Sequence, residues 1–161
     1  MSESIRHPIP PYVPEGSRVL ILGTMPSPKS REAGFYYMHP QNRFWPALAG
    51  VFNETVPLSV AERKAFSDRH GIALWDVLAC CRIDGASDAS IRDAEPNDVA
   101  ALLDQTGITR VFTTGSTAAR YYRQLILPVC GVDTVTLPSP SSANARMRLE
   151  DLIGAYRQIL L

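Results

Sequence analysis

The chain has 161 residues, of which 45% are hydrophobic and 20% are charged, and 16 lysines and arginines balance 16 aspartates and glutamates. A chain of this size can bury a core of its own, so we expect one domain over residues 1–161. Zero net charge argues against a protein that holds nucleic acid through overall positive charge. Nothing resembles a signal peptide or a membrane span, so we expect a cytoplasmic protein with no membrane partner.

The three cysteines provide no disulfide framework, and two of them, Cys80 and Cys81, are adjacent. Three thiolates also fall short of the four that an iron–sulfur cluster takes from cysteine. We therefore expect no metal and no other cofactor.

Charge is distributed unevenly along the chain. Residues 84–104 carry six carboxylates and a single cation. By contrast, the loops that carry the motifs described below contain five cations: Lys29, Arg31, Arg43, Arg146 and Arg148. A local basic rim on a neutral body suits brief contact with a few phosphates, although an ordinary mixed surface accounts for the same charges equally well.

Short apolar segments that end in turn or polar residues predict four strands, at residues 18–23, 72–78, 109–114 and 133–137. Apolar residues at helical spacing predict helices around residues 58–66, 99–103, 118–126 and 149–159. The first sixteen residues contain four prolines and are expected to form an arm on the surface. Strands that alternate with helices predict an α/β fold, a three-layer αβα arrangement around a central four-stranded, mostly parallel sheet.

Ligands of such sheets bind at the carboxyl ends of the strands. Polar residues follow each predicted strand, at residues 24–30, at Asp76 with the turn 80–84, and at residues 113–116 and 139–144. We therefore expect these four segments to converge on one edge of the sheet and to form one site.

Two segments in the first third of the chain carry the strongest chemical signals. In Gly23-Thr-Met-Pro-Ser-Pro28, the glycine allows a substrate to approach the main chain and the prolines stiffen the loop. A plain strand-to-helix turn is the alternative. The second segment, residues 34–46, packs five aromatic residues around His39, Asn42 and Arg43. Flat rings beside a few hydrogen-bonding groups suit a flat polar ligand such as a nucleobase.

Gly23-Thr-Met-Pro-Ser27 and His39-Pro-Gln-Asn-Arg-Phe-Trp45 resemble the first-motif region of the uracil-DNA glycosylase superfamily, and most of all its hypoxanthine-DNA glycosylase branch, often called family 6. The resemblance continues through Leu74-Trp-Asp-Val77 and Gly115 to Leu137-Pro-Ser-Pro-Ser-Ser142, and so covers nearly the whole chain. The joint order of these motifs is specific, whereas no single motif would be.

The resemblance implies that Asn42 is catalytic. Other branches use an Asp or Asn of the first motif to handle the attacking water, but Met25 stands in that place here and cannot do so. An amide lacks useful basicity, so Asn42 would orient the water through its carbonyl oxygen. Alternatively, or in addition, it caps a helix that begins at Arg43. His39 is a second catalytic candidate, as a donor to the leaving base or a phosphate, and equally a packing residue.

The base pocket that the resemblance implies combines ring walls with hydrogen-bonding groups. Tyr36 and Tyr37 are candidates for the stacking platform, whereas Phe44 and Trp45 are expected to be largely buried. The carboxylate of Asp76 suits a ring N–H such as N1–H of hypoxanthine, unless it merely caps a turn at the strand end. The candidate base-binding residues are Gly23, Thr24, Met25, Tyr36, Tyr37, Trp75, Asp76 and Thr114.

The segment Leu137-Pro-Ser-Pro-Ser-Ser-Ala-Asn-Ala-Arg146 resembles the second motif of the superfamily, a His-Pro-Ser-Pro loop that presses on the DNA backbone. Leu137 replaces the histidine, so the donor that stabilises the oxyanion in uracil enzymes is missing. Serines before a helix start suit phosphate, with a simple N-cap at Ser142 as the alternative. The candidate DNA-binding residues are Ser27, Lys29, Pro138, Ser139, Ser141, Ser142, Asn144 and Arg146.

These residues lead us to expect a monofunctional DNA glycosylase that hydrolyses the N-glycosidic bond of a deaminated base, with hypoxanthine as the expected base, in base excision repair. Lys29 is the only lysine of the motifs, so we expect no Schiff-base lyase chemistry. The expected partner is double-stranded or single-stranded DNA that contains a damaged base, bound by a monomer. Two alternatives remain: a uracil- or mismatch-specific glycosylase, and a catalytically weak module that binds nucleotides or nucleic acid.

Overall fold

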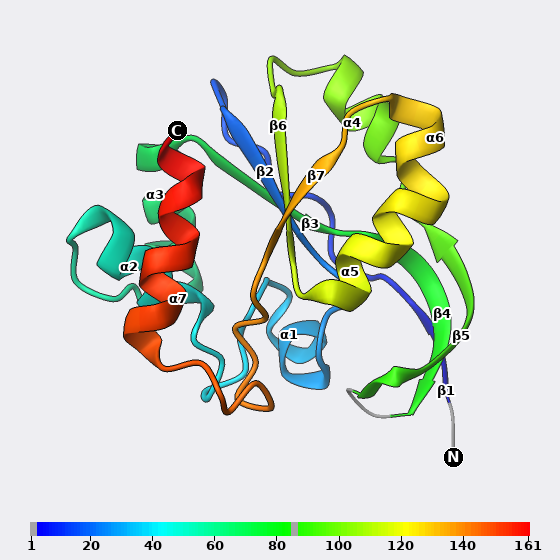
Figure 1. Cartoon of the computed structure of the whole chain (residues 1–161), viewed down its shortest axis with the longest axis horizontal. Coiled ribbons are helices and arrows are strands. Elements are labelled where there is room, and N and C mark those ends of the chain that lie inside the picture. The colour runs from blue at the N-terminus through cyan, green and yellow to red at the C-terminus, as the bar shows by residue number, and fades with distance from the viewer. Residues whose placement is uncertain (1–2, 85–86) are drawn as a thin grey trace.

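The computed structural model describes residues 3–84 and 87–161, and a sheet of four strands runs through its centre (Figure 1). The strands lie in the order β3-β2-β6-β7, and every neighbouring pair is parallel. Each strand falls inside one of the four predicted segments, which confirms the central four-stranded sheet. The bounds are Val19–Gly23 for β2, Ile72–Asp76 for β3, Arg110–Thr114 for β6 and Thr134–Leu137 for β7.

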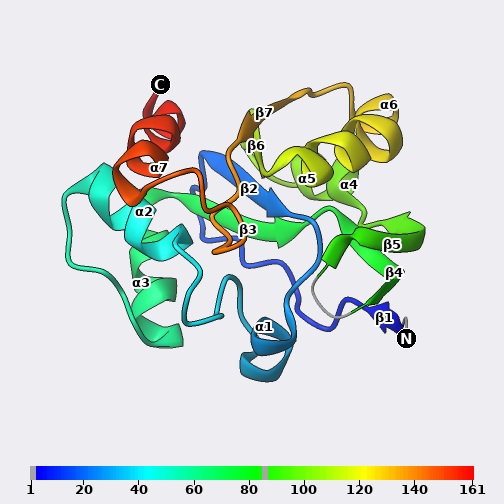
Figure 2. The same cartoon turned by 60° about the horizontal axis from the view of Figure 1, so that its bottom comes forward.

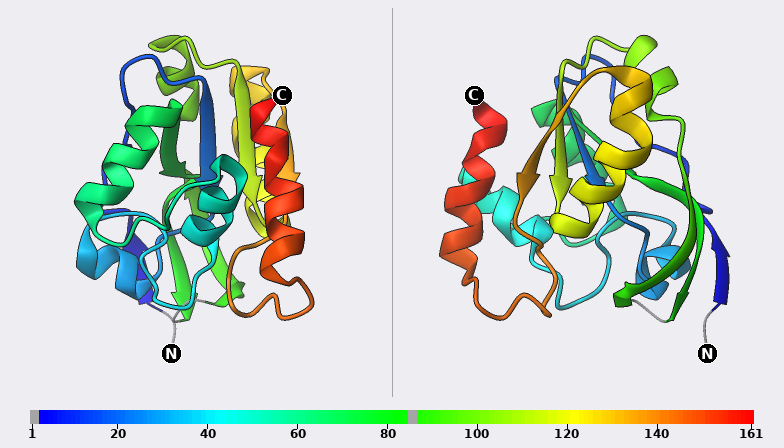
Figure 3. Two further views of the ribbon diagram at one scale, coloured as in Figure 1. Left: turned by 90° about the vertical axis from the view of Figure 1, so that its left-hand side faces the viewer. Right: turned by 45° about the vertical axis from the view of Figure 1, so that its right-hand side comes forward.

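Helices cover both faces of this sheet, which confirms the three-layer arrangement (Figure 2, Figure 3). One layer contains α2 (Phe44–Phe52), α3 (Val60–His70) and α7 (Leu149–Tyr156), which continues into the 3-10 turn η2 (Arg157–Leu160). The other contains α4 (Val99–Asp104), α5 (Ser116–Tyr121), the π-helical turn η1 (Tyr122–Ile126) and α6 (Leu127–Cys130). None of the helices in the described residues is long and apolar enough to cross a membrane.

Strand β2 contributes to two separate cores. Val19 and Ile21 pack with the aromatic residues of α2 and α3, whereas Leu20 and Leu22 pack with the helices of the opposite layer. All four side chains are at most 3% exposed. Successive side chains of a strand point to opposite faces, so a strand covered on both faces has a continuous apolar sequence.

The aromatic residues that follow β2 form a dense part of one core. Phe35, Phe44 and Trp45 are at most 2% exposed. The Nε1–H of Trp45 donates a hydrogen bond to the Tyr36 carbonyl oxygen at 3.1 Å. The expected burial of Phe44 and Trp45 is therefore confirmed.

A second, antiparallel sheet lies beside the first, in the order β1-β4-β5. Its strands are β1 (Glu3–Arg6), β4 (Leu78–Asp84) and β5 (Ser87–Pro96). The sequence predicts one strand through residues 72–78, but β3 ends at Asp76 and the chain turns at Val77 into β4. This turn directs the β4–β5 hairpin toward the carboxyl edge of the parallel sheet.

Residues 3–16 are not the surface arm that their prolines suggest, and residues 1–2 lie outside the described residues. Strand β1 pairs with β4 along its whole length. Ile5 and Ile9 are only 7% and 5% exposed. Tyr12 exchanges two backbone hydrogen bonds with Leu74 of β3, at 2.9 and 2.8 Å. Apolar residues between the prolines therefore tie this segment to both sheets.

Candidate active site

A cavity of ≈ 110 Å³ lies at the carboxyl edge of the parallel sheet, where β2 and β6 end. The chain places β3 on one side of β2 and β6 on the other, and α/β sheets bind ligands at such a switch point. The short helix α1 (Pro28–Ala33) and the loops of residues 34–43 and 138–148 gather at this edge, below the sheet in Figure 1.

Residues from all four strand ends line the cavity, so these ends converge as expected. The expected turn at residues 80–84 is instead part of strand β4, and none of these residues lines the cavity. Four lining residues belong to no predicted set: Pro26, Ser30, Asp88 and Pro140. The predicted site residues that line it are Gly23, Thr24, Met25, Ser27, Tyr36, Tyr37, Asn42, Asp76, Thr114, Ser139 and Ser141.

Asp76 supplies a buried carboxylate at the end of β3. Its side chain pairs with the imidazole of His7, with 2.7 Å between Oδ2 and Nε2, and the residue is 3% exposed. The Asn97 amide donates to the Asp76 carbonyl oxygen at 2.9 Å, and the Val77 backbone N–H donates to the Gly23 carbonyl oxygen at 2.8 Å. Both the side chain and the backbone of Asp76 are therefore fixed.

Gly23 allows this carboxylate to approach the end of β2. A Cβ atom at Gly23 would lie 2.6 Å from Asp76 Oδ1, 3.2 Å from the Tyr37 hydroxyl and 3.7 Å from Thr114 Oγ1. The first of these distances is a clash. The missing side chain therefore makes room for three polar groups of the protein itself.

Tyr37 reaches the end of β6 and lines the cavity there. Its hydroxyl is 3.0 Å from Thr114 Oγ1, and its ring stacks on Phe44 with 3.7 Å between centroids. Burial raises the pKa of Tyr37 well above its ordinary value, and the charge of Asp76 adds to the effect, so the phenol is neutral. Its φ of 54° is uncommon for a residue other than glycine, which means that the surrounding contacts hold this conformation.

Tyr36 is the less suitable platform for a base. It is 1% exposed, and its hydroxyl donates to the Pro10 carbonyl oxygen at 2.8 Å. Tyr37 is half-buried and its ring stacks on Phe44, so of the two tyrosines it is the more accessible.

Asn42 lines the cavity and also supports the start of α2. Its Oδ1 accepts the Phe44 backbone N–H at 2.9 Å, two residues along the chain. Asn42 is not the helix cap, because α2 begins at Phe44 and its N-cap position is Arg43, whose side chain makes no capping bond. The amide NH₂ of Asn42 has no hydrogen-bond partner among the described residues, and its carbonyl oxygen has a second lone pair. The bond to Phe44 therefore leaves bonding capacity for a ligand or a water.

Arg43 does not contribute to a basic rim. Its guanidinium donates to the carbonyl oxygens of Ser141 at 2.9 Å, Asn144 at 3.0 Å and Met147. Its backbone N–H donates to the Pro140 carbonyl oxygen at 2.9 Å. These bonds hold the second-motif loop against the start of α2.

The second-motif loop does not lead directly into a helix, contrary to the sequence expectation at Ser142. Residues 141–147 form turns before α7 begins. The Ser139 hydroxyl accepts the Ser141 backbone N–H, and the Ser141 hydroxyl accepts the Ala143 backbone N–H, each at 3.2 Å. These hydroxyls organise the loop, and the helix N-terminus that would favour phosphate lies elsewhere.

The remaining predicted DNA-binding residues fall into two groups. Lys29, Ser142 and Arg146 are exposed and can reach a ligand outside the cavity. Pro138 and Asn144 are half-buried and bond within the protein. The Pro138 carbonyl oxygen accepts a tyrosine hydroxyl at 2.7 Å, and the Asn144 amide donates to the loop backbone at 3.0 Å.

His39 and Trp75 lie outside the cavity, unlike the other predicted catalytic and base-binding residues. His39 is exposed, and its Nδ1 accepts a backbone N–H of its own loop at 3.1 Å. Trp75 precedes Asp76 in β3, and neighbouring strand residues face opposite sides. Its ring lines a separate hollow with Pro11 and Val13 of the N-terminal segment.

Sequence reasoning missed two ionisable residues, His7 and Asp88. Asp88 belongs to the acidic stretch and reaches the cavity from β5. Desolvation raises the pKa of Asp88, and the nearby charge of Asp76 adds to it. No local pattern could identify either residue, because both depend on the second sheet for their position.

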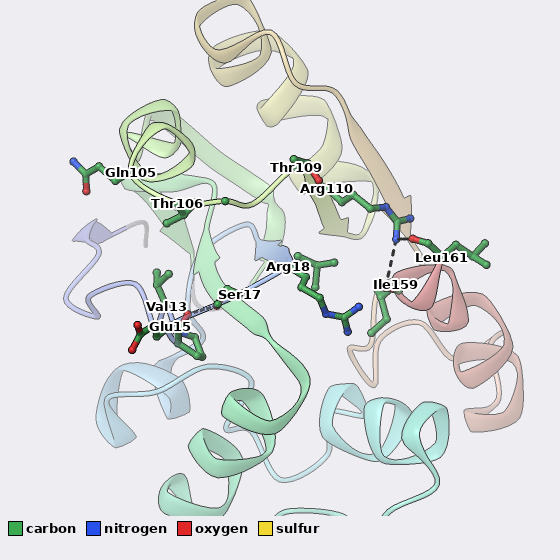
Figure 4. Close-up of a pocket in the computed structure, with 14 residues that line it drawn as sticks. Val13, Glu15, Ser17, Arg18, Gln105, Thr106, Thr109, Arg110, Ile159 and Leu161 are labelled. Carbon is green, nitrogen blue, oxygen red and sulfur yellow. Dashed lines mark hydrogen bonds between the residues drawn. The ribbon is translucent and has the colours of Figure 1, made fainter.

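A larger cavity of ≈ 770 Å³ lies at the opposite, amino-terminal edge of the parallel sheet (Figure 4). The guanidinium groups of Arg18 and Arg110, which line this cavity, donate hydrogen bonds to backbone carbonyl oxygens. Arg110 donates to the carbonyl oxygens of Gln158 at 2.9 Å and Ile159 at 3.4 Å, and Arg18 donates to that of His70 at 3.3 Å. None of the predicted site residues lines this cavity.

The parallel sheet and the small polar and aromatic cavity at its switch point define an α/β protein with a candidate ligand site at the carboxyl ends of its strands. The family model of the uracil DNA glycosylase superfamily matches residues 10–160, and the chain belongs to this superfamily of DNA glycosylases.

Individual relatives are similar over most of their length. The chain is 32% identical over 143 residues to a hypoxanthine DNA glycosylase of Methanosarcina acetivorans, covering 88% of this chain and 90% of the relative. It is 33% identical over 139 residues to a hypoxanthine DNA glycosylase of Methanosarcina barkeri, with coverages of 85% and 87%. A solution NMR structure from M. acetivorans, provisionally described as a uracil DNA glycosylase, superposes with a TM-score of 0.80 at 27% identity, covering 99% of this chain and 100% of that one.

Proposed function

We propose that the protein is a monofunctional DNA glycosylase that releases hypoxanthine from deoxyinosine in DNA, as a step of base excision repair. Relatives that are 32% and 33% identical carry the name hypoxanthine DNA glycosylase. The observation that carries the proposal is the buried carboxylate of Asp76, whose Oδ1 lies beside Gly23 and has no hydrogen-bond partner among the described residues. A carboxylate accepts hydrogen bonds but cannot donate them, so it selects a base with a ring N–H.

The size and lining of the cavity suit one base rather than a whole nucleotide. Its ≈ 110 Å³ is well below the roughly 300–1,000 Å³ of pockets for drug-sized ligands. The ring of Tyr37, backed by Phe44, offers an aromatic surface. The hydroxyls of Tyr37 and Thr114 share one hydrogen bond, and Thr114 Oγ1 also lies 3.5 Å from the Leu22 carbonyl oxygen, to which it can donate. When Thr114 donates to Tyr37 instead, the Tyr37 proton is free to bind O6 of hypoxanthine while Asp76 accepts N1–H.

The proposed reaction begins when the damaged nucleotide leaves the helical stack, which is easiest for a mispaired base. The bond between C1′ and N9 breaks, and its electron pair moves to the base, which takes up a proton. A water adds to the oxocarbenium-like C1′ and loses its proton to solvent. Asn42 orients this water through its amide and does not take the proton, because an amide is not a useful base.

We propose that the protein acts as a monomer on double-stranded or single-stranded DNA. The exposed side chains of Lys29, Ser142 and Arg146 are the candidates for phosphate contact. Because the net charge of the chain is zero, binding depends on these few local contacts rather than on the overall field.

Single-turnover release of the base from matched duplexes that contain inosine, xanthosine or uracil tests the proposal. We expect hypoxanthine to be released fastest. Faster release of uracil would contradict the choice of base, since uracil also presents a ring N–H but is smaller. Release from none of the three duplexes would overturn the proposed activity itself.

A further inference from the structure

We propose that His7 is a positioning residue for Asp76. It occupies one oxygen of the carboxylate so that the other oxygen faces the base, and it thereby favours hypoxanthine over purines whose N1 carries a lone pair. This inference rests on the proposed function and concerns how the same cavity discriminates between bases.

The hydrogen bonds of His7 determine its tautomer. Its Nδ1 accepts the Ile9 backbone N–H at 3.2 Å, so this nitrogen carries no proton. In a neutral imidazole the proton is then on Nε2, which lies 2.7 Å from Asp76 Oδ2. The side chains of His7 and Asp76 are 2% and 5% exposed, so water hardly competes for this bond.

The N-terminal segment holds His7 on more than one side. Its backbone N–H donates to the Ala79 carbonyl oxygen at 2.6 Å and so extends the pairing of β1 with β4. Its ring lies 6.1 Å from the ring of Tyr36, measured between centroids, and Tyr36 is itself anchored to Pro10 by a hydrogen bond of 2.8 Å. The segment that carries β1 therefore delivers an imidazole to the end of β3.

The arrangement leaves Asp76 Oδ1 as the oxygen available to a ligand. It lies next to Gly23, while the neighbouring hydroxyls of Tyr37 and Thr114 bond to each other at 3.0 Å. Asp88 lines the same cavity and adds a second carboxylate.

The carboxylates of Asp76 and Asp88 distinguish purines by whether N1 carries a proton or a lone pair. Hypoxanthine directs N1–H toward Asp76 Oδ1, whereas adenine directs a lone pair there. A site built to accept a hydrogen bond rejects an analogue that lacks the donor, because its buried acceptor is then left unpaired. Undamaged adenine is therefore excluded only as long as Oδ1 is held in place.

Two substitutions at position 7 separate the donor from the shape of the side chain. His7→Gln places an amide N–H near the position of Nε2, whereas His7→Phe fills similar space without a donor. The substrates are duplexes that contain inosine or 2′-deoxynebularine, a purine nucleoside with a bare N1. The readouts are the single-turnover rate at saturating enzyme, the affinity for undamaged duplex, and thermal unfolding as the control for folding.

We expect His7→Phe to slow release from inosine by about tenfold and to reduce the inosine-to-nebularine rate ratio by a similar factor, the size expected for a lost hydrogen bond to a charged group. His7→Gln should recover the rate to within about threefold of wild type. Affinity for undamaged duplex should be unchanged in both. His7→Leu is a second variant without a donor, in case His7→Phe does not fold.

The same substitutions in an Asp76→Asn background complete the test. If His7 acts through Asp76, the His7→Gln and His7→Phe variants should release hypoxanthine at the same rate in the Asp76→Asn background. If a folded His7→Phe or His7→Leu variant keeps the wild-type inosine-to-nebularine rate ratio, the role of His7 is overturned. The proposed function is untouched by that result as long as the wild type releases hypoxanthine. Failure of the wild type to release hypoxanthine would contradict the proposed function and, with it, this inference.

Discussion

The two cavities at opposite edges of the parallel sheet differ both in size and in chemistry. The chemistry tells more about which of them binds a ligand. The amino-terminal cavity has ≈ 770 Å³, but the guanidiniums of Arg18 and Arg110 that line it donate to backbone carbonyl oxygens (Figure 4). The carboxyl-edge cavity has only ≈ 110 Å³, yet Asp76 and Asn42 there keep bonding capacity beyond their contacts within the described residues. Buried polar groups normally find partners, so unsatisfied capacity locates a site better than volume does.

The largest expected effect is that of removing the Asn42 amide. Asn42→Ala should cut base release by two or more orders of magnitude, about 3 kcal/mol of barrier, because the water loses its orienting group. The variant also loses the hydrogen bond to the Phe44 N–H at the start of α2, which costs stability of about 1 kcal/mol.

Asn42→Ser separates these two effects, because a serine hydroxyl can still accept the helix N–H. We expect it to recover thermal stability but not the single-turnover rate. A well-folded Asn42→Ala variant with wild-type excision would move the chemistry elsewhere.

The next largest effect is expected when a glycine at each cavity is replaced by alanine and the two variants are compared. Gly23→Ala places a Cβ atom 2.6 Å from Asp76 Oδ1, so the carboxylate must move, and we expect release of hypoxanthine to slow by tens-fold, on the order of 2 kcal/mol of barrier. Gly107 lines the large cavity, and a Cβ atom there would meet nothing within 4 Å. Gly107→Ala is therefore the matched control, and equal rates in the two variants would remove the distinction between the cavities.

Asp76→Asn should alter the choice of base more than the stability of the fold. An amide can donate as well as accept, so the preference for a ring N–H over a bare N1 should fall by about tenfold, the size of one hydrogen bond to a charged group. The measurement compares release from duplexes that contain inosine, whose base has a ring N–H, with release from duplexes that contain 2′-deoxynebularine, whose N1 is bare. A loss by the same factor on both would make Asp76 a structural residue.

Arg146→Ala should have the smallest effect. The side chain is exposed beside the second-motif loop, so its loss should weaken binding to damaged and undamaged duplex alike and reduce the salt slope by about one ion. Arg18→Ala, in the large cavity, should leave the slope unchanged. Identical slopes and affinities for wild type and Arg146→Ala would show that Arg146 points away from DNA.

Most of the parallel sheet can be predicted from sequence because its strands are buried on both faces. The run from Val19 to Leu22 has no polar interruption, and its end at Gly23 is marked by glycine and proline. The strands of the second sheet give a much weaker signal. In β5 only Ile91 is fully buried among polar and charged residues, and the prolines near β1 hide the apolar positions Ile5 and Ile9.

The same holds for the site: local sequence patterns predict some of its residues, whereas others are brought there only by tertiary contacts. Thr114 can be placed because it ends a predicted strand, and Asp76 because it lies near the end of another. His7 cannot, because its contact with Asp76 joins residues 69 positions apart. The helix expected at Ser142 is absent because Arg43 binds the carbonyl oxygens of this loop and keeps it in turns.

Titration of the labelled protein with free hypoxanthine, followed by NMR of the backbone amides, tests the central claim most directly. If the carboxyl-edge cavity binds the base, the amides of Gly23, Asp76 and Thr114 should shift in a saturable way, while those of Gly107 and Arg110 stay in place. Saturable shifts at Gly107 and Arg110, with Gly23, Asp76 and Thr114 unaffected, would contradict the account and assign the base to the larger cavity.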